Sequence, residues 1–402
     1  MKKHLLSTSA IALGVVAAAP ASAQDWDLDW GGYFSSHIAI VDVSGNGASG
    51  TDYDGIGFLN TGEIIFSPSV TLDNGLTFGV NVQMEAQNGG GGSDGIDESY
   101  MTISGDSFGQ LIIGSENSAG YKSMVGAPGV TSMYINSPSI SAFIPLSSVL
   151  PFSFRDAGVS SYTEVGGNND VPRLTYFTPS FNGFQAGVSY ARNNRGNATQ
   201  GFDANGAVNN TRIGDVEDIF DLGMSYNQTF GTVDVSLGAR WGTGSVKGGT
   251  STTAAFFDTD PTSATVGTVV PAATSTTTSG DITTWGIGAQ LGFGAVTVGG
   301  SYAENNNNDA GNTSSTGWSF GGTYDAAGPW AFELLTYQGE YKSSGTGGAD
   351  EEYEAYRLGA SRDLGPGVDW DIYYVYASGE DKGSSANDVD GNIIGTAINL
   401  SF

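Results

Sequence analysis

Apolar and polar residues alternate along most of this 402-residue chain. In the clearest stretch, from residue 76 to residue 87, the apolar positions are Leu76, Phe78, Val80, Val82, Met84 and Ala86. A period of two is typical of a β-strand whose two faces meet different environments. The same alternation recurs at residues 63–72, 233–241, 284–293 and 368–376. The chain is therefore predicted to be all-β, with strands that have one apolar and one polar face.

The connections between these strands alternate in length. Short turns fall at residues 73–75, 105–109, 179–183, 230–231, 293–294, 326–329 and 364–367. Long polar loops fall at about 43–56, 88–95, 116–171, 193–216, 243–280, 304–314, 340–351 and 379–391. Seven short turns and eight long loops join sixteen strands. Short turns on one side and long loops on the other predict a 16-stranded antiparallel transmembrane β-barrel.

Alternation alone would also fit a soluble β-sandwich, whose apolar faces pack on each other. Three further features favour the barrel. Sixteen strands close without leaving an edge strand, and the last strand ends on Phe402. Aromatic residues also gather near the short turns, as they do at membrane interfaces: Phe66, Phe78, Phe108, Phe177, Phe181, Phe184, Phe230, Phe293, Trp330, Phe332 and Trp370.

The first 23 residues have the features of a secretory signal peptide. Lys2 and Lys3 precede an apolar run that ends in the small-residue sequence Ala21-Ser22-Ala23, as at a cleavage site. Residues 24–402 are then the barrel. Removing the two lysines leaves 12 basic and 42 acidic residues, a formal charge of −30. Such a charge disfavours nucleic acid as a partner.

The stretch from Glu116 to Val171 is far longer than a hairpin loop of about 2–5 residues. It is too apolar for a disordered segment, since it contains Tyr121, Met124, Met133, Tyr134, Ile140, Phe143, Ile144, Leu146, Leu150, Phe152, Phe154 and Tyr162. A segment of this composition must lie against another surface. We expect it to fold into the barrel; the alternative is an external lid or a variable surface loop.

Several short motifs resemble a known family. The final strand has alternating apolar residues that end in Ile398, Leu400 and Phe402, residues 104–114 form a strand-turn-strand motif, and residues 170–176 form a strand after the long insert. These motifs and the sixteen-strand layout resemble the general-diffusion porins of Gram-negative bacteria, in the alphaproteobacterial branch. In that family the C-terminal strand is read by the outer-membrane assembly machinery, which implies this role for Ile398, Leu400 and Phe402.

The resemblance implies an outer-membrane channel, exported through the periplasm and embedded in outer-membrane lipid as a homotrimer. It implies that small hydrophilic solutes diffuse passively through the pore. It also implies that the third long loop, residues 116–171, folds inward and narrows the channel. The candidate residues of this constriction are Glu116, Asp156, Glu164 and Asp170, with the aromatic residues Tyr121, Tyr134 and Phe154.

The predicted lumen wall departs from the family pattern. In the family, acidic residues of the constriction loop face basic residues on the early strands, but this chain has no Lys or Arg between Lys3 and Lys122. The candidate wall residues are His37, Glu63, Glu85, Glu98, Arg173, Arg240 and Arg357. The three arginines either form a positive side or neutralise nearby acids. Because acids dominate, we expect a preference for cations.

No constellation of catalytic residues stands out. The mature chain has one histidine, His37, and no cysteine, so we expect neither an enzyme nor a cofactor. Asp381, Asp388 and Asp390 could offer oxygen ligands to Ca²⁺, but solvated loop charge is the preferred interpretation and we expect no metal site. Two alternatives to passive diffusion remain: a substrate-specific channel with an aromatic binding track, and a structural or adhesive surface barrel.

Overall fold

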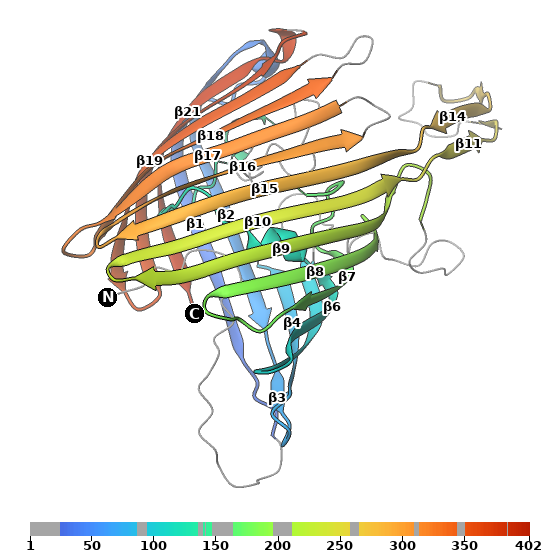
Figure 1. The fold of residues 1–402 in the computed structure, drawn as a ribbon. Coiled ribbons are helices and arrows are strands. Elements are labelled where there is room, and N and C mark those ends of the chain that lie inside the picture. The colour runs from blue at the N-terminus through green and yellow to red at the C-terminus, as the bar shows by residue number, and fades with distance from the viewer. Residues whose placement is uncertain are drawn as a thin grey trace.

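The computed structural model describes residues 25–86, 95–135, 140, 142–146, 164–195, 211–257, 265–308, 313–343, 350–383 and 385–402. These ranges form one large antiparallel sheet that closes on itself (Figure 1). The predicted signal peptide lies outside the described residues. No helix in the described ranges is long and apolar enough to cross a membrane.

The sheet is a closed barrel of sixteen strands, as predicted. It contains seventeen strand segments, of which two, β2 and β3, both pair with β4 and so occupy one position. The strands are β1 (Trp30–Ser44), β2 (Gly55–Phe66), β3 (Ser69–Thr71), β4 (Thr77–Glu85), β5 (Glu98–Gly105), β6 (Gly109–Glu116), β7 (Val171–Phe177), β8 (Phe184–Asn193), β9 (Val216–Phe230), β10 (Val233–Val246), β15 (Gly280–Phe293), β16 (Val296–Asn308), β17 (Thr313–Asp325), β18 (Trp330–Ser343), β19 (Glu351–Gly365), β20 (Val368–Asp381) and β21 (Val389–Ser401).

The first and last strands close the barrel. β1 pairs with β21 from Tyr33 opposite Ser401 to Ser44 opposite Asp390. Beyond this ladder, the Phe402 N–H donates to the Gly32 carbonyl at 3.1 Å, and the Gly32 N–H donates to the Phe402 carbonyl at 3.0 Å. The predicted assembly residues Ile398, Leu400 and Phe402 are exposed on the outer surface of this seam.

The barrel is apolar on its outside. In β1, His37, Ala39 and Val41 are buried, whereas Ile38 and Ile40 between them are 50% and 61% exposed. The same inversion recurs around the barrel, with exposed Phe58, Leu174, Met224, Phe320, Leu334, Leu358 and Ile394. Alternating strands with large apolar residues on the outer face match a barrel solvated by lipid. This decides against a soluble sandwich, in which these faces would be buried.

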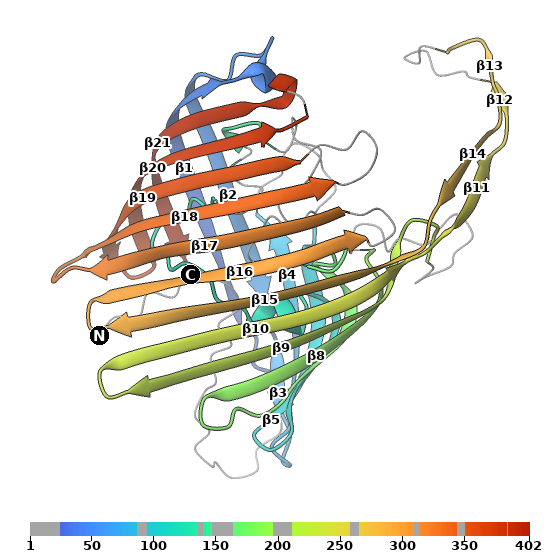
Figure 2. The ribbon, with the colours of Figure 1, turned by 45° about the horizontal axis from the view of Figure 1, so that its top comes forward.

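Two segments differ from the sequence prediction. The alternation of residues 63–72 predicted one strand, but it is interrupted at Ser67 and Pro68, between β2 and β3, because proline cannot donate a ladder hydrogen bond. Residues 243–280 were predicted to be a polar loop. Most of this segment instead forms a two-stranded ribbon that continues β10 and β15 beyond the barrel (Figure 2).

The strands of this ribbon are β11 (Gly249–Thr253), β12 (Phe256–Phe257), β13 (Val269–Val270) and β14 (Ala273–Thr277). Short helical elements within the described ranges include α1 (Ala119–Ser123), η1 (Asn46–Ala48) and η5 (Ser385–Asn387). The helix α1 begins the long insert between β6 and β7, which lies inside the barrel.

Candidate functional site

The insert, residues 117–170, follows the inner wall of the barrel from its first turn. Ser118 caps α1 by accepting a hydrogen bond from the Tyr121 N–H at 3.1 Å, which satisfies one of the free donors of a helix start. The Ala119 N–H donates to Ser189 Oγ of β8 at 2.7 Å. The helix therefore lies directly against the wall formed by β8, β9 and β10.

Glycines on the wall allow the insert backbone to approach closely. A Cβ atom on Gly223 of β9 would overlap the Ala119 carbonyl, and one on Gly238 of β10 would overlap the Ser123 carbonyl. A Cβ on Gly288 of β15 would overlap the carbonyl of Val125. Each of these positions tolerates only hydrogen as a side chain, so three adjacent strands form a groove that fits this segment.

The middle of the insert is held by two acidic side chains of the wall. Glu333 of β18 accepts hydrogen bonds from the Val130 N–H at 2.5 Å and from the Thr131 N–H at 3.2 Å. Its other oxygen accepts the Thr131 hydroxyl at 2.5 Å. Asp371 of β20 accepts the N–H and hydroxyl of Ser132 at 2.8 and 2.9 Å. These carboxylates satisfy backbone donors that would otherwise be buried without partners.

Arg357 of β19 balances the charge of Glu333. Its Nε lies 2.7 Å from Glu333 Oε1, and both side chains are almost fully buried. The guanidinium also donates to the carbonyl of Met133. Arg357, Glu333 and the insert turn at residues 129–133 thus form one buried polar unit, in which removal of either charge would leave the other without its ion-pair partner.

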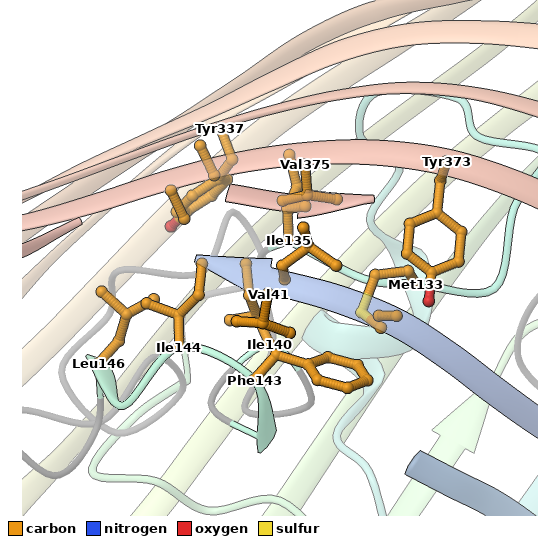
Figure 3. Close-up of a cluster of buried hydrophobic side chains, with 14 of the residues drawn as sticks. Val41, Met133, Ile135, Ile140, Phe143, Ile144, Leu146, Tyr337, Tyr373 and Val375 are labelled. Carbon is orange, nitrogen blue, oxygen red and sulfur yellow. The ribbon is translucent and has the colours of Figure 1, made fainter. Parts of the chain in front are cut away.

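Beyond this unit the insert becomes apolar and packs against β1 and β18–β21. Its residues Met133, Ile135, Ile140, Phe143, Ile144 and Leu146 are buried in a cluster with wall residues that include Val41, Tyr337, Tyr373 and Val375 (Figure 3). The Tyr353 hydroxyl donates to the Ile135 carbonyl at 2.6 Å. A Cβ on Gly57 or Gly391 would lie within 3 Å of Phe143 or Ile144. The predicted inward fold of the insert is therefore confirmed.

The end of the insert is fixed by a second buried ion pair. Arg240 of β10 and Asp221 of β9 are 2.5 Å apart, and neither side chain is exposed. Asn168 donates to the other oxygen of Asp221 at 3.0 Å. Asn305 of β16 donates to the Glu164 carbonyl at 2.8 Å. The insert is thus tied to the wall at both ends and in the middle.

The predicted constriction acids lie mainly where the insert joins the wall. Glu116 is 1% exposed and pairs with Lys122 at 2.9 Å. Glu164 is also 1% exposed, and Asp170 is half-buried. The burial of Glu116 and Glu164 favours an anchoring role over contact with solutes. Asp156 and Phe154 lie outside the described residues.

The three arginines predicted on the lumen wall are all buried. Arg240 and Arg357 pair with Asp221 and Glu333, and Arg173 donates to the carbonyls of Val171 and Asn168. The sequence left two interpretations of these arginines open, a positive side of the lumen or neutralisation of nearby acids. Their burial matches neutralisation. None of the three contributes a free positive charge to the open part of the lumen.

The wall formed by β2, β4 and β5 carries acids instead. Glu63 and Glu85 are directly opposite each other on β2 and β4, and ligand atoms of Glu63, Glu85 and Asp97 all lie within 4.8 Å of one another. Glu98 beside them is buried and accepts Gln83 Nε2 at 2.6 Å and Asn117 Nδ2 at 2.8 Å. Three half-buried carboxylates at this spacing form a cluster of acidic groups on this wall.

Tyr134 is the aromatic residue of the insert that faces this acidic wall. Its side chain is 44% exposed, although its neighbours Met133 and Ile135 are buried. It interacts electrostatically with Arg357, Glu63 and Tyr33, and the Tyr33 hydroxyl donates to Glu63 at 3.0 Å. Tyr121, near the start of the insert, is half-buried. Of the two aromatic candidates that are described, Tyr134 is the more accessible.

The remaining predicted residues have structural partners. His37 is buried, and its Nδ1 lies 3.0 Å from the Tyr373 hydroxyl. Asp388 accepts the Asp381 N–H at 2.9 Å, and Asp390 accepts the Ser44 hydroxyl at 2.9 Å. The first of these carboxylate contacts lies at the end of β20, and the second joins β1 to β21. Across the described ranges, Asp381, Asp388 and Asp390 are not brought together as a potential metal site.

The sequence prediction missed Asp221, Glu333 and Asp371, the acids that hold the insert. The sequence feature that could have identified these acids is their phase in the strand. Glu333 lies between Phe332 and Leu334, and Asp371 lies between Trp370 and Ile372. An acid in the inward phase of an alternating strand faces the barrel interior. Sequence alone does not reveal that this part of the interior is occupied by another segment.

Comparisons with known proteins agree with this architecture. A sequence profile of the family described as Gram-negative porin matches residues 7–384. No curated protein matches the chain. Three solved structures are similar in fold at low sequence identity.

The anion-selective porin from Comamonas acidovorans is 17% identical, with a TM-score of 0.55 over 94% of this chain and 100% of the porin. The outer membrane channel DcaP of Acinetobacter baumannii is 11% identical, with a TM-score of 0.60 over 96% and 100% of the two chains. Salmonella typhi OmpF, solved with daunomycin, is 14% identical, with a TM-score of 0.57 over 93% and 97%.

Proposed function

We propose that this chain, which belongs to the Gram-negative porin family and forms a channel in the outer membrane, passes small hydrophilic solutes and ions passively and prefers cations. Family membership rests on the profile match over most of the chain. The preference for cations is a property of this chain's own residues and is argued from the two walls of its interior.

The proposed preference for cations rests on the different positions of the basic and the acidic side chains. Arg173, Arg240 and Arg357 are buried, and Arg240 and Arg357 pair with the wall acids Asp221 and Glu333. Glu63, Glu85 and Asp97 gather on the wall opposite, in a part of the sequence without any Lys or Arg. A low-dielectric wall focuses the field of such acids into the lumen. Cations are therefore concentrated there and anions are excluded.

Reversal potentials across a KCl gradient test this proposal directly. The purified protein is inserted into a planar bilayer, and the potential at zero current is measured with the higher KCl concentration on one side. A preference for K⁺ gives a potential of the sign that opposes K⁺ flow. A potential of the opposite sign, with clear single-channel steps, would overturn the cation preference while leaving the channel function intact.

We propose a homotrimer as the functional assembly, on the basis of the family resemblance. Crosslinking of the native outer membrane followed by mass measurement tests this, since a trimer gives three copies per particle. The proposed partners are otherwise outer-membrane lipid, which fits the apolar outer face, and the assembly machinery, which would read the exposed end at Phe402. The alphaproteobacterial assignment stays a prediction.

A substrate-specific channel is the second candidate, and the exposed ring of Tyr134 opposite Glu63 favours it. An aromatic face beside carboxylates suits a cationic or hydroxyl-rich organic solute. Ion current that is blocked in a saturable way by one solute would support this specific channel. A barrel that inserts but does not conduct would instead support a structural or adhesive role.

A further inference from the structure

The ribbon that extends β10 and β15 projects away from the barrel (Figure 2). Its two small sheets, β11 with β14 and β12 with β13, each contain two strands only. Among the described residues, both outer edges of β11 and β14 are therefore without a neighbouring strand. Two strands alone are marginally stable in water, and a third or fourth strand stabilises them. The ribbon has the properties of an incomplete sheet.

The edges of β11 and β14 lack the usual protection against strand pairing. Natural edge strands carry charged residues, proline or bulges that block another strand. β11 has the sequence Gly-Thr-Ser-Thr-Thr and β14 the sequence Ala-Thr-Ser-Thr-Thr. Their register is continuous, from Gly249 opposite Thr277 to Thr253 opposite Ala273. Both edges thus present regular and uncharged backbone to solvent.

Charge makes the ribbon unusual in this protein. The chain carries 42 acidic and 14 basic residues, so two copies repel each other over most of their surfaces. Residues 248–257 and 265–280 contain no charged side chain at all. Phe256, Phe257 and Val269, further along the ribbon, are 50%, 59% and 66% exposed. The uncharged strands β11 and β14 are therefore edges on which two strongly acidic copies can touch without like charges meeting, whereas Asp258 and Asp260 follow Phe257 further along the sequence.

The strand sequences also indicate what the partner is. In the ribbon itself, Thr250 faces Thr276, Ser251 faces Ser275 and Thr252 faces Thr274. The hydroxyls of both threonine pairs lie within hydrogen-bond distance, at 3.2 and 3.3 Å. A Thr-Ser-Thr strand is symmetric about its serine, so it pairs in antiparallel fashion with an identical strand. The same cross-strand pairs that build the ribbon would form between two copies of β11.

We propose that this ribbon is a homotypic contact, in which the β11 edge of one copy pairs with the β11 edge of a second copy about a two-fold axis at Ser251. The result is a four-stranded sheet shared by two barrels. A contact that uses the same surface on both partners closes on itself, so each ribbon joins one other ribbon. β10 and β15 lie across the barrel from β1 in the strand order, so the ribbon and the β1 seam face opposite directions.

The absence of cysteine makes a clean crosslinking test possible. Ser251→Cys places thiols directly opposite each other in the proposed contact, at a separation that suits a disulfide. Ser275→Cys reports on the other edge of the ribbon. Ser385→Cys, on the exposed element η5, is the matched control outside the ribbon. Each variant is reconstituted into liposomes at equal density and oxidised, and the linked pairs are measured on a denaturing gel.

The proposal expects Ser251→Cys to give a linked pair as the main product, several-fold more than Ser275→Cys or Ser385→Cys. Equal yields from all three variants would overturn it, and a dominant yield from Ser275→Cys would overturn the choice of edge. A second variant, Ser251→Lys, places like charges opposite each other, which disfavours pairing. Energy transfer between copies labelled at Ser385→Cys should then fall several-fold, with single-channel conductance unchanged as proof of folding.

Discussion

The inward-facing residues of the alternating strands have different roles on the two sides of the barrel interior. On β8–β10 and β15–β21, inward positions include glycines, paired charges and apolar residues that contact the insert. On β2 and β4, inward positions include Glu63 and Glu85, with Asp97 just before β5, whereas Glu98 of β5 is buried and bonded to Asn117 of the insert. The first wall accommodates another segment of the chain, and the second faces the lumen.

This difference separates two roles of buried charge. Glu333 and Asp371 accept hydrogen bonds from backbone N–H groups of the insert, so these carboxylates hold the insert in position. Glu63, Glu85 and Asp97 are half-buried and lie within 4.8 Å of one another, and under the proposed function their charges act on solutes. Selectivity should depend on the second wall, and channel dimensions on the first.

The largest effect is expected from breaking the buried unit that holds the middle of the insert. Glu333→Ala leaves Arg357 buried without its ion-pair partner and removes the acceptor of three donors in Val130 and Thr131. Losing one partner of a buried pair costs about 3–5 kcal/mol. The temperature at which the barrel unfolds on a denaturing gel should fall, and single-channel currents should become noisy.

The matched control for this variant is Glu352→Ala, on the neighbouring strand β19. Glu352 is exposed and pairs with Lys382 at 3.0 Å, an interaction of little energetic weight. Glu333→Gln should lie between the two, because it keeps one acceptor but loses the charge. Equal stability of the Glu333→Ala and Glu352→Ala proteins would show that the insert is not held by Glu333.

A smaller effect is expected from filling the glycine groove. Gly288→Val places a side chain where the Val125 backbone lies, and overpacking of this kind costs about 1–3 kcal/mol. The insert should move off the wall toward the lumen, so single-channel conductance should decrease. Gly95→Ala is the control, since a Cβ there meets nothing within 4 Å. An unchanged conductance in Gly288→Val would contradict close docking of the insert.

Neutralising the open wall should alter selectivity and leave stability nearly unchanged. The triple variant Glu63→Gln, Glu85→Gln and Asp97→Asn removes three charges that lie close together. The reversal potential in a KCl gradient should move toward zero, with little change in unfolding temperature. Glu354→Gln, on the outer side of β19, serves as the control. A reversal potential that stays at the wild-type value would locate the selectivity elsewhere.

The smallest effect is expected from Tyr134→Ala. The ring is 44% exposed and faces Glu63, so its removal should widen the passage and raise conductance slightly. Tyr324→Ala, an exposed position on the lipid side of β17, should leave conductance unchanged. If Tyr134 instead forms a solute track, the variant should also lose saturable block by aromatic-binding solutes. A conductance equal to that of Tyr324→Ala would remove Tyr134 from the constriction.

Much of the fold could be predicted because strand alternation is a local property. The alternation of apolar and polar residues and the alternation of short turns with long loops can both be read directly from the sequence. The inward positions of Glu63, His37 and Arg240 follow from their phase in the residue alternation. The ribbon at residues 249–277 was missed because its Thr and Ser residues have loop-like composition and no apolar alternation. The anchors Asp221, Glu333 and Asp371 were missed because their partners are remote in the sequence.

The sequence by itself determined the number of strands, their two faces and the length and composition of the insert, since all of these depend on neighbouring residues. Only the tertiary structure decided which wall the insert covers. That choice depends on glycines and acids from strands β9 to β20 that meet residues 119–133 across the barrel interior. Only the structure also showed that the predicted lumen arginines are buried, Arg240 and Arg357 as partners of Asp221 and Glu333.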